Sequence, residues 1–370
     1  MIRILMLANA ESIHTVRWAN AIAANKGYEV HLVSRRPPLE KIRADVRVWV
    51  APWPTSLGYF LNAPFVRGVI RTIRPTLVHA HYASGYGTLG RLAGFHPLVL
   101  SVWGADVYDF PRKSAIHRWL IQRNLASADR VLSTSRVMTV ETHKYTQKEI
   151  DVTPFGVDLD QFEPRAEASG FGRENIVIGT IKTLDSKYGI EFLIRAFKLV
   201  KDKHPKLPLK MLIVGTGPDQ SRLKKLAVVL GVMQDTVFAG HIEHSEVPRY
   251  HNMLSVSVFL SVKHSESFGV AVIEASACGK PVVVANVGGL PEVVEDGVTG
   301  FVVEPRNAKQ TANAIEKLVL DESLRRRMGE CGKRRVERLY NWAESVNKVL
   351  RIYREVIDGY LANDGAWQKK

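Results

Sequence analysis

The chain has 370 residues, of which 46% are hydrophobic, and carries a formal net charge of +14. This length favours two domains of ordinary size over one, and the hydrophobic content is ample for two cores. No apolar run approaches the ~20 residues that a transmembrane helix needs. The apolar start is interrupted at once by Glu11, His14 and Arg17, so it predicts a first strand and not a signal peptide.

The two cysteines, Cys278 and Cys331, exclude a disulfide framework, and neither has a neighbour at metal-ligand spacing. This usage fits a reducing, cytoplasmic environment. The basic excess is compatible with nucleic acid, an anionic membrane surface, a phosphorylated substrate, or simply a solvated basic surface. Because the excess is spread over both halves of the chain, it does not indicate a dedicated basic tail.

Apolar runs alternate between strand-like and helix-like along the whole chain, which predicts parallel sheets with helices on both faces. Two of the helices predicted in the first half are 15–25 and 116–127. The strands predicted in the first half are 2–7, 29–34, 47–50, 77–81, 98–102 and 130–133.

A stretch rich in turn-forming residues, 154–164, breaks this alternation and predicts the linker between two domains. The last long helical stretch is 343–361. The strands predicted after the linker are 176–181, 209–214, 236–238, 256–262, 281–285 and 300–303. We therefore predict an α/β fold of two Rossmann-like, doubly wound domains, 1–163 and 164–343, facing a central cleft at the carboxyl ends of their strands.

Glu266 and Glu274, with seven residues between them, form the most informative feature of the chain. Glu266 lies in the loop after the predicted strand 256–262, and Glu274 lies inside a predicted helix that is apolar nearly all round. A carboxylate there is costly unless hydrogen-bond donors surround it. Those donors are either the hydroxyl groups of a ligand, or backbone amides and a lysine.

This segment resembles the retaining nucleotide-sugar glycosyltransferases of family 4, which have the B-type fold of two Rossmann-like domains. The resemblance covers most of the chain and is strongest over 176–305. It implies that Glu274 holds the ribose hydroxyls of a nucleotide-sugar donor and that Glu266 contacts the donor sugar. It also implies that the final helix, 344–370, packs back on the first domain.

The loop after the predicted strand 176–181 carries Lys182 and Lys187. In the resembled family an arginine and a lysine at this spacing grip the donor's diphosphate, so both lysines are implied to be catalytic. Lysine in the arginine position keeps the charge but loses the bidentate fork. One residue, Tyr188, is inserted before Gly189, where the family has the glycine directly after its lysine.

Further donor contacts are implied by the resemblance at the neighbouring loops. Free backbone N–H groups at the start of a helix favour an anion. The implied donor-binding residues are Gly215, Gly217, His241, Ile242, Ser267, Phe268, Gly269 and Val270. Glu292 faces the ligand or is a first-turn carboxylate that the helix dipole favours.

Asp158-Leu-Asp160 is an Asp-x-Asp pair of the kind that binds manganese in glycosyltransferases of the other major fold. Here it lies in the linker, within a short sequence motif that the resembled family also has. Elsewhere the sequence has no cluster at metal-ligand spacing. We therefore expect neither a metal nor a cofactor, the nucleotide-sugar being a co-substrate.

On the acceptor side, Asp106 matches a residue of the family and is implied to contact the sugar or the acceptor, with a helix cap as the alternative. Trp103 stands where many members have a histidine near the reacting sugar. His81, at the end of a predicted strand, contacts substrate or is a structural histidine. His14, before the first helix, is a weaker candidate.

Arg67, Arg71 and Arg74 recur at helical spacing, close to several aromatic residues. A basic helix beside aromatic residues is typical of an interfacial segment at an anionic membrane, and a solvated charged face is the alternative. The first reading places the protein at the inner face of the plasma membrane and suggests a lipid-linked acceptor.

We thus expect a retaining, metal-independent hexosyl- or N-acetylhexosaminyl-type glycosyltransferase. It would move a sugar from a nucleotide-sugar donor, with a UDP-sugar favoured over a GDP-sugar, to a hydroxyl of a saccharide or lipid-linked acceptor. The setting would be bacterial-type synthesis of cell-surface polysaccharide or glycolipid. The alternatives are a sugar-nucleotide epimerase of the same fold and a nucleic-acid-binding protein, for which no basic-aromatic motif is found.

Overall fold

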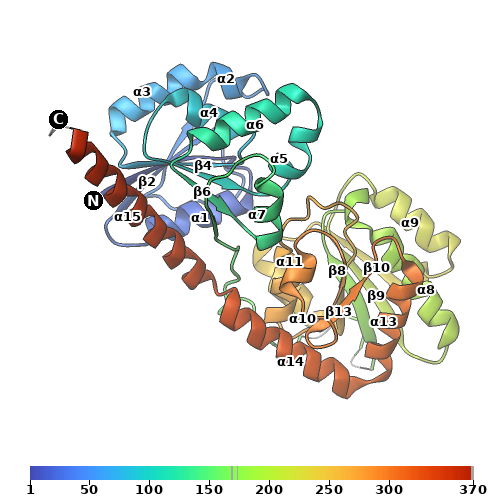
Figure 1. Cartoon of the computed structure of the whole chain (residues 1–370). Helices are drawn as coiled ribbons and strands as arrows, with labels where there is room; N and C mark the ends of the chain where they lie inside the picture. The colour runs from blue at the N-terminus through green and yellow to red at the C-terminus, as the bar shows by residue number, and fades with distance from the viewer. Residues whose placement is uncertain (168–169, 173, 368–370) are drawn as a thin grey trace. The chain divides into compact units, whose positions relative to one another are not determined.

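The computed structural model describes residues 1–167, 170–172 and 174–367. It divides into two compact units (Figure 1). Unit 1 consists of Met1–Pro154 together with the segment that begins at Glu344, and unit 2 is Phe155–Ala343. The first boundary lies at the start of the turn-rich stretch in which the sequence placed the linker.

Unit 1 is built on a seven-stranded parallel sheet of order β3-β2-β1-β4-β5-β6-β7. Its strands are β1 Ile2–Leu7, β2 Tyr28–Ser34, β3 Arg47–Val50, β4 Leu77–His81, β5 Leu98–Val102, β6 Arg130–Ser133 and β7 Ile150–Val152. The sequence predicted the first six and missed β7. This edge strand has only three residues, all partly buried, and its Asp151 pairs with Arg130, so it is too short to show a strand pattern in the sequence.

The core of unit 1 lies between the sheet and α3, α4 and α6. In Figure 1 these helices cover one face of the sheet, and α1 and α15 lie on the other. The helices are α1 Ile13–Ala23, α2 Gly58–Leu61, α3 Ala63–Ile73, α4 Gly85–Ala93, α5 Ala105–Tyr108, η1 Phe110–Arg112, α6 Ala115–Ser127, α7 Arg136–Thr142 and α15 Trp342–Trp367. The contact of α15 with the sheet includes the Tyr353 hydroxyl, which lies 2.6 Å from His79 Nδ1 in β4.

Unit 2 is built on a six-stranded parallel sheet of order β10-β9-β8-β11-β12-β13. Its strands are β8 Ile176–Ile181, β9 Leu209–Val214, β10 Thr236–Gly240, β11 Val256–Phe259, β12 Val282–Ala285 and β13 Gly300–Val303. The predicted strand 256–262 ends three residues early. The reason is that Val262 N–H turns away to donate to the Lys187 carbonyl at 2.8 Å, outside the sheet.

The larger core of unit 2 packs its sheet against α8, α9 and α13. The helices are η2 Ser186–Tyr188, α8 Ile190–Lys203, α9 Gln220–Val229, η3 Met233–Asp235, η4 His244–Glu246, α10 Val247–Met253, α11 Val270–Ala277, α12 Leu290–Val293, α13 Ala308–Leu320 and α14 Glu322–Leu339. Phe197 of α8 is fully buried in this core. Truncating such a side chain to alanine costs about 3–5 kcal/mol.

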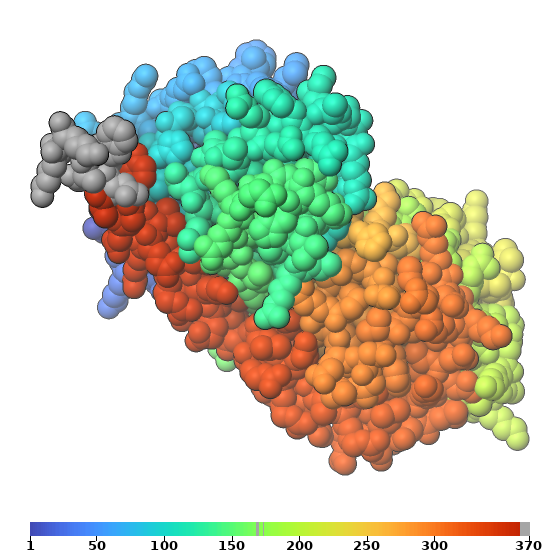
Figure 2. Space-filling model, viewed as in Figure 1, coloured from blue at the N-terminus to red at the C-terminus, as the bar shows by residue number. Residues whose placement is uncertain are grey.

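The basic α14 lies on the visible face of unit 2 in Figure 2, in orange-red. It buries only four residues, of which Met328 and Val336 are the large ones. Its Arg326 side chain is 78% exposed and pairs only loosely with Glu330, at 3.9 Å. Part of the positive charge of the chain is therefore a solvated helix face.

Both sheets reverse their strand order at one place, which is where doubly wound folds bind ligands. In unit 1 this place lies between β1 and β4, because the strands before and after it continue towards opposite edges of the sheet. In unit 2 the corresponding place lies between β8 and β11. All strands run parallel, so the carboxyl ends of each neighbouring pair meet at the same edge. The predicted α/β class with two Rossmann-like sheets is confirmed.

Candidate functional site

In unit 2 the two central strands place Lys182 and Glu266 next to each other. Lys182 directly follows β8, and Glu266 lies in the loop between β11 and α11. The Lys182 ammonium donates to Glu266 Oε1 at 3.0 Å, and the two side chains are 20% and 13% exposed. The Ser261 hydroxyl lies 3.4 Å from the other oxygen, Oε2. Two residues that the sequence assigned to the donor are thus in direct contact at the switch point.

The surroundings keep the Lys182 side chain charged. Burial is the largest single influence and by itself would lower the pKa of Lys182, and the charge of Glu266 is the strongest of several influences that oppose it. Tyr188, the hydrogen bond to Glu266 and the charge of Glu274 act in the same direction, and the net pKa is raised above its ordinary value of 10.5. A cation is therefore available at this edge of the sheet at neutral pH.

Lys187 belongs to the short η2 turn, which is held at both ends. The carboxylate of Asp185 caps the turn by accepting from Lys187 N–H at 2.9 Å. At the other end Gly189 has φ = 62°, and a Cβ there would lie 2.0 Å from the Leu260 carbonyl oxygen. The positive φ and the close approach to the carbonyl oxygen both require glycine at this position.

Glycines let the loop after β9 pack against the loop that carries Lys182. A Cβ on Gly215 would lie 2.2 Å from the Lys182 carbonyl oxygen, and one on Gly217 would lie 2.4 Å from that of Leu184. Backbone hydrogen bonds join the same loops, since Lys182 N–H donates to Val214 at 2.9 Å. The two predicted donor-binding glycines therefore fix the backbone beside Lys182.

The Gly288-Gly289 pair supports the loop of Glu266 in the same way. Gly289 N–H donates to the Glu266 carbonyl at 2.9 Å, and a Cβ on Gly288 would lie 2.1 Å from that oxygen. Their close approach in the structure is to the Glu266 backbone, so they position Glu266.

Glu274 lies on α11 and is only 6% exposed. One ionisable neighbour is His251 of α10, whose Nε2 lies 3.9 Å from Glu274 Oε2. His251 is fully buried and was not selected from the sequence, because a lone histidine in a short helix gives no signal. The charge of Glu274 also contributes to the raised pKa of Lys182, so both belong to one electrostatic group.

The remaining predicted donor residues line up along the same edge with different accessibility. Gly269, with φ = 100°, is the residue immediately before α11, and Val270 is the first residue of the helix. The ring of Phe268 packs against Tyr340, with centroids 5.3 Å apart, so only its backbone faces the site. Ser267 is buried, His241 is exposed, and Ile242 packs against a small apolar cluster.

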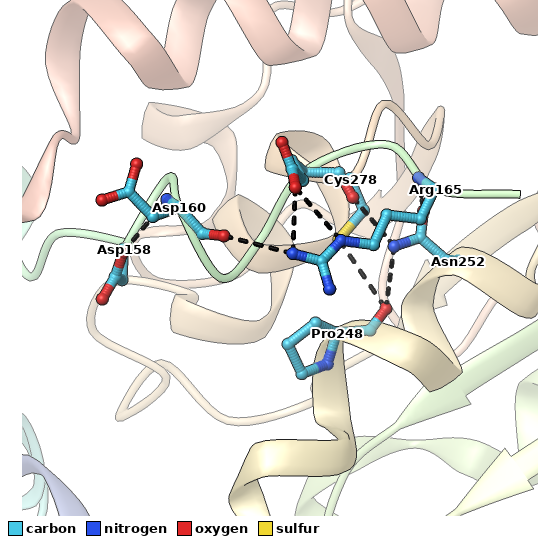
Figure 3. A network of polar contacts seen from close by, with 7 residues as sticks. Asp158, Asp160, Arg165, Pro248, Asn252 and Cys278 are labelled. Carbon is cyan, nitrogen blue, oxygen red and sulfur yellow. Dashed lines mark hydrogen bonds and ion pairs between the residues drawn. The ribbon is translucent and has the colours of Figure 1, made fainter. Parts of the chain in front are cut away.

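The segment with the Asp-x-Asp pair lies at the start of unit 2 and is held there by hydrogen bonds within the chain (Figure 3). Asp158 Oδ1 accepts from Asp160 N–H at 3.1 Å, which closes a local turn. Further on, Arg165 N–H donates to the Asn252 side chain of α10 at 3.0 Å. The same figure shows Cys278 beside α10, where burial raises the pKa of its thiol to about 12 and keeps it protonated.

In unit 1 the structure brings the three acceptor-side candidates together. The Trp103 ring lies 4.6 Å from the His81 ring, 6.3 Å from that of His14 and 5.6 Å from that of Tyr82. These residues come from the carboxyl ends of β4 and β5 and from the start of α1, at the switch point of this sheet. Tyr82 is 37% exposed and joins the group without having been predicted.

Burial holds the two histidines of β4 neutral. It lowers the pKa of His81 to about 3, and it also lowers the pKa of His79, with the charge of His81 adding to the effect. His79 is engaged on both ring nitrogens, with Ser101 Oγ at 2.7 Å and the Tyr353 hydroxyl at 2.6 Å. His81 Nδ1 is buried and has no hydrogen-bond partner among the described residues, so His81, unlike His79, keeps an unused ring nitrogen.

The Asp106 carboxylate is buried and accepts three backbone hydrogen bonds. The donors are the N–H groups of Ala83 at 2.7 Å, Gly104 at 2.8 Å and Trp103 at 3.1 Å. Burial raises the pKa of Asp106, and these hydrogen bonds oppose the shift without cancelling it. The structure shows no side-chain cap at α5; the carboxylate instead joins the Trp103 loop to the segment that follows β4.

The three arginines lie on or just after α3, with their side chains exposed. Arg67 donates to the Leu92 carbonyl at 2.6 Å, and Arg74 ends the helix in a left-handed conformation with φ = 48°. The apolar side chains nearby belong to α2, where Phe60 and Leu61 are 45% and 48% exposed. Over the described part of the chain, no helix has the length and apolar character to span a membrane.

Two family models match the chain. "Glycosyl transferases group 1" matches residues 161–335, and "Glycosyl transferase 4-like" matches residues 3–135. The first covers the strands and loops of unit 2 that carry the two lysines and both glutamates, and the second covers most of the sheet of unit 1.

Curated relatives carry glycosyltransferase names. D-inositol 3-phosphate glycosyltransferase of Thermobifida fusca is 27% identical over 95% of this chain and 89% of its own length. The enzyme of that name from Corynebacterium jeikeium is 31% identical, over 59% of this chain and only 54% of its own length. GDP-mannose-dependent alpha-(1-6)-phosphatidylinositol monomannoside mannosyltransferase of Mycolicibacterium smegmatis is 30% identical over 67% of each chain.

Solved structures share the fold over almost the whole chain. Sucrose-phosphate synthase from Thermosynechococcus elongatus superposes with a TM-score of 0.85 at 22% identity, covering 97% of this chain and 100% of its own. Anabaena HepE in complex with UDP and glucose gives 0.79 at 20% identity, over 96% and 100%. With the two family models and the mycobacterial relative, these matches show that the protein belongs to the glycosyl transferases group 1 and is a glycosyltransferase of the B-type fold.

Proposed function

We propose that the protein is a retaining glycosyltransferase that transfers a hexosyl or N-acetylhexosaminyl group from a nucleoside diphosphate sugar to a hydroxyl acceptor. Unit 2 binds the donor, and unit 1 binds the acceptor. The observation that carries the proposal is the contact of Lys182 with Glu266 at the switch point of unit 2, with Lys187 and the buried Glu274 on the adjoining elements.

The charges of these side chains suit a diphosphate donor. Without a ligand, Lys182 is balanced by Glu266 at 3.0 Å. A bound diphosphate draws the ammonium groups of Lys182 and Lys187 towards its oxygens, assisted by the N–H groups at the start of α11. Glu266 is then released to accept hydrogen bonds from the sugar, and Glu274 accepts those of the ribose hydroxyls.

In the proposed reaction, the bond between the anomeric carbon and the diphosphate oxygen breaks, and the nucleoside diphosphate leaves on the face that the acceptor enters. The lysines and the helix start stabilise the negative charge that develops on the leaving group. A phosphate oxygen of the leaving group takes the proton of the acceptor hydroxyl, so the enzyme supplies no nucleophile. Since lysines supply the positive charge, no metal is required, and turnover should persist in EDTA.

We favour UDP over GDP as the nucleotide of the donor. HepE, which shares the fold, was solved with UDP, whereas the mycobacterial relative is named as GDP-mannose-dependent. The names of the curated relatives refer to inositol phosphate and phosphatidylinositol acceptors, which is compatible with a role in cell-surface glycolipid or polysaccharide synthesis. Peripheral association with a membrane through α3 and α2 would bring the enzyme to a lipid-linked acceptor.

A thermal-shift panel of UDP-sugars and GDP-sugars tests this function. At 100 times its dissociation constant, a ligand stabilises the folded state by about 2.7 kcal/mol. We expect one nucleotide series to raise the melting temperature by several degrees and the Glu274→Ala variant to lose most of that shift. If neither series shifts the wild-type protein, the proposed donor class is wrong.

The stereochemistry and the reaction class are tested with the donor found in this way. Proton NMR of the first product should show the same anomeric configuration as the donor, and product should form only when an acceptor is present. An inverted product would overturn the retaining mechanism. Conversion of the nucleotide-sugar without acceptor would indicate an epimerase.

A further inference from the structure

We propose that Tyr188 is a positioning residue of the donor site that holds the ammonium groups of Lys182 and Lys187 against one ring, so that both reach the same diphosphate. The inference deepens the proposed function and rests on it. It concerns the residue that is inserted before Gly189, to which the sequence assigned no role.

The Tyr188 ring lies against both lysine side chains. Its centroid is 4.4 Å from Lys182 Nζ and 4.8 Å from Lys187 Nζ. Both are within the ~6 Å at which an aromatic ring attracts a cation. Because both distances are measured to the same centroid, the separation of the two ammonium groups cannot exceed the sum of these two distances. The ring thus gathers two cations from different positions of the same loop.

Two like charges need a reason to stay close together. Lys182 has a carboxylate partner, Glu266, at 3.0 Å. For Lys187 the structure shows a ring contact with Tyr188 and a capped backbone. The tyrosine ring therefore supplies an attraction that holds the second ammonium group at the same ring as the first. A lysine without such a contact would extend into solvent and pay more side-chain entropy on binding.

The backbone of Tyr188 is itself fixed, so the ring is a defined platform. Tyr188 N–H donates to the Asp185 carbonyl at 3.0 Å. Val262 N–H donates to the Lys187 carbonyl at 2.8 Å. Gly189 follows in a left-handed conformation that only glycine allows here. The turn is thereby tied to the segment that leads from β11 to Glu266.

Simple core packing is the competing explanation, because Tyr188 is half-buried and touches the core of unit 2. The two roles respond differently to substitution. Tyr188→Phe keeps the ring face and the packing, whereas Tyr188→Leu keeps an apolar side chain and loses the ring. Phe301→Leu is the matched control, since it removes another ring–lysine contact, with Lys317 at 5.3 Å, away from the donor loops.

The experiment is isothermal titration calorimetry of the full chain with UDP, GDP, inorganic pyrophosphate and the nucleosides uridine and guanosine. We expect Tyr188→Leu to weaken the binding of the preferred nucleoside diphosphate and of pyrophosphate roughly tenfold. The nucleoside should bind as in wild type. Tyr188→Phe and Phe301→Leu should both bind the diphosphate within about twofold of wild type.

Three outcomes are decisive. If Tyr188→Leu binds diphosphates like wild type while Lys187→Ala binds them less tightly, Tyr188 has no positioning role and the proposed function stands. If Tyr188→Leu weakens nucleoside and diphosphate binding equally, the tyrosine acts by packing alone, which also overturns the inference. If wild type binds none of the diphosphates, the proposed function fails, and the inference fails with it.

Discussion

Single residues in unit 2 have separable tasks. Glu274 is buried on α11, and in the proposed complex its oxygens accept the ribose hydroxyls, so Glu274→Ala should mainly weaken donor binding. Hydrogen bonds to a charged group contribute about 1.5–3 kcal/mol each, which corresponds to at least a tenfold increase in the dissociation constant. Calorimetry with the donor nucleotide measures this, and an unchanged affinity would exclude the ribose role.

Lys187 differs, because its charge matters most when the leaving group develops negative charge. Lys187→Ala should lower kcat by two orders of magnitude or so, the usual cost of one electrostatic group in a transition state. The change in KM should be much smaller. Steady-state kinetics separate the two constants, and a rise in KM at unchanged kcat would show that Lys187 contributes only to ground-state binding.

The neutral His81 predicts how stability depends on pH. Its pKa in the folded protein is about 3, below the ordinary value of 6.5, so the unfolded chain binds more protons between these values. The contribution of His81 to stability is therefore complete above pH 6.5 and is lost as the pH falls towards 3. One such group gives a slope of up to about 1.4 kcal/mol per pH unit.

Urea unfolding at several pH values between 7 and 4.5 checks this prediction. His81→Phe keeps a ring beside Trp103 and cannot be protonated, so its stability should fall less steeply with pH than that of wild type. Equal slopes in the two proteins would mean that folding does not lower the pKa of His81.

At the scale of loops and helices, the contact of Gly288 with the Glu266 backbone gives a sharp test. An alanine Cβ there would lie 2.1 Å from the Glu266 carbonyl oxygen, so Gly288→Ala must displace the loop. Gly297→Ala is the control, because Gly297 also has a positive φ, 75°, with nothing within 4 Å of an added Cβ. A left-handed alanine costs roughly 1–2 kcal/mol.

We expect Gly297→Ala to lose only the stability that a left-handed alanine costs and to keep its activity. Gly288→Ala should lose more stability and also most of its activity, because Glu266 moves away from the sugar. Thermal unfolding and turnover of both variants decide the matter. Equal activity in the two would show that the position of Glu266 does not depend on Gly288.

The exposed face of α3 and α2 predicts a salt-sensitive attraction to anionic membranes. Arg67, Arg71 and Arg74 are solvent-exposed, and Phe60 and Leu61 lie in the short helix just before them. Near an anionic surface each cation contributes about 1 kcal/mol. The triple substitution to glutamine should lower sedimentation with phosphatidylserine vesicles and leave neutral vesicles unaffected. Unchanged sedimentation would show that this face is a solvated charged surface and does not bind membranes.

For the whole molecule, the sequence was most informative where the chemistry leaves a pattern. Continuous apolar runs marked the buried parallel strands, whose ends were found within a few residues, and the lysine and glutamate spacings marked the loops that meet at the switch point of unit 2. The strand β7, Ile150–Val152, was missed because three residues are too few to show a strand pattern. The end of β11 was missed because a hydrogen bond to Lys187, far away in the sequence, draws Val262 out of the sheet.

Side-chain neighbours that depend on the tertiary fold were beyond prediction. Tyr188 was noticed only as an insertion, although its ring contacts both lysines. His251 beside Glu274 gave no signal. Asp106 was expected at a substrate, and the structure engages its carboxylate with three backbone N–H groups. These relations arise when loops from different strands converge.

The central claim is that the nucleotide-sugar binds at the carboxyl edge of the unit 2 sheet. Hydrogen–deuterium exchange of the full chain, with and without the preferred nucleoside diphosphate, tests it directly. We predict slower exchange in the loops after β8 and β9 and at the start of α11, in peptides spanning 182–189, 215–218 and 264–274. Slower exchange confined to unit 1, or unchanged exchange in all three peptides at a saturating nucleotide concentration, would contradict the account.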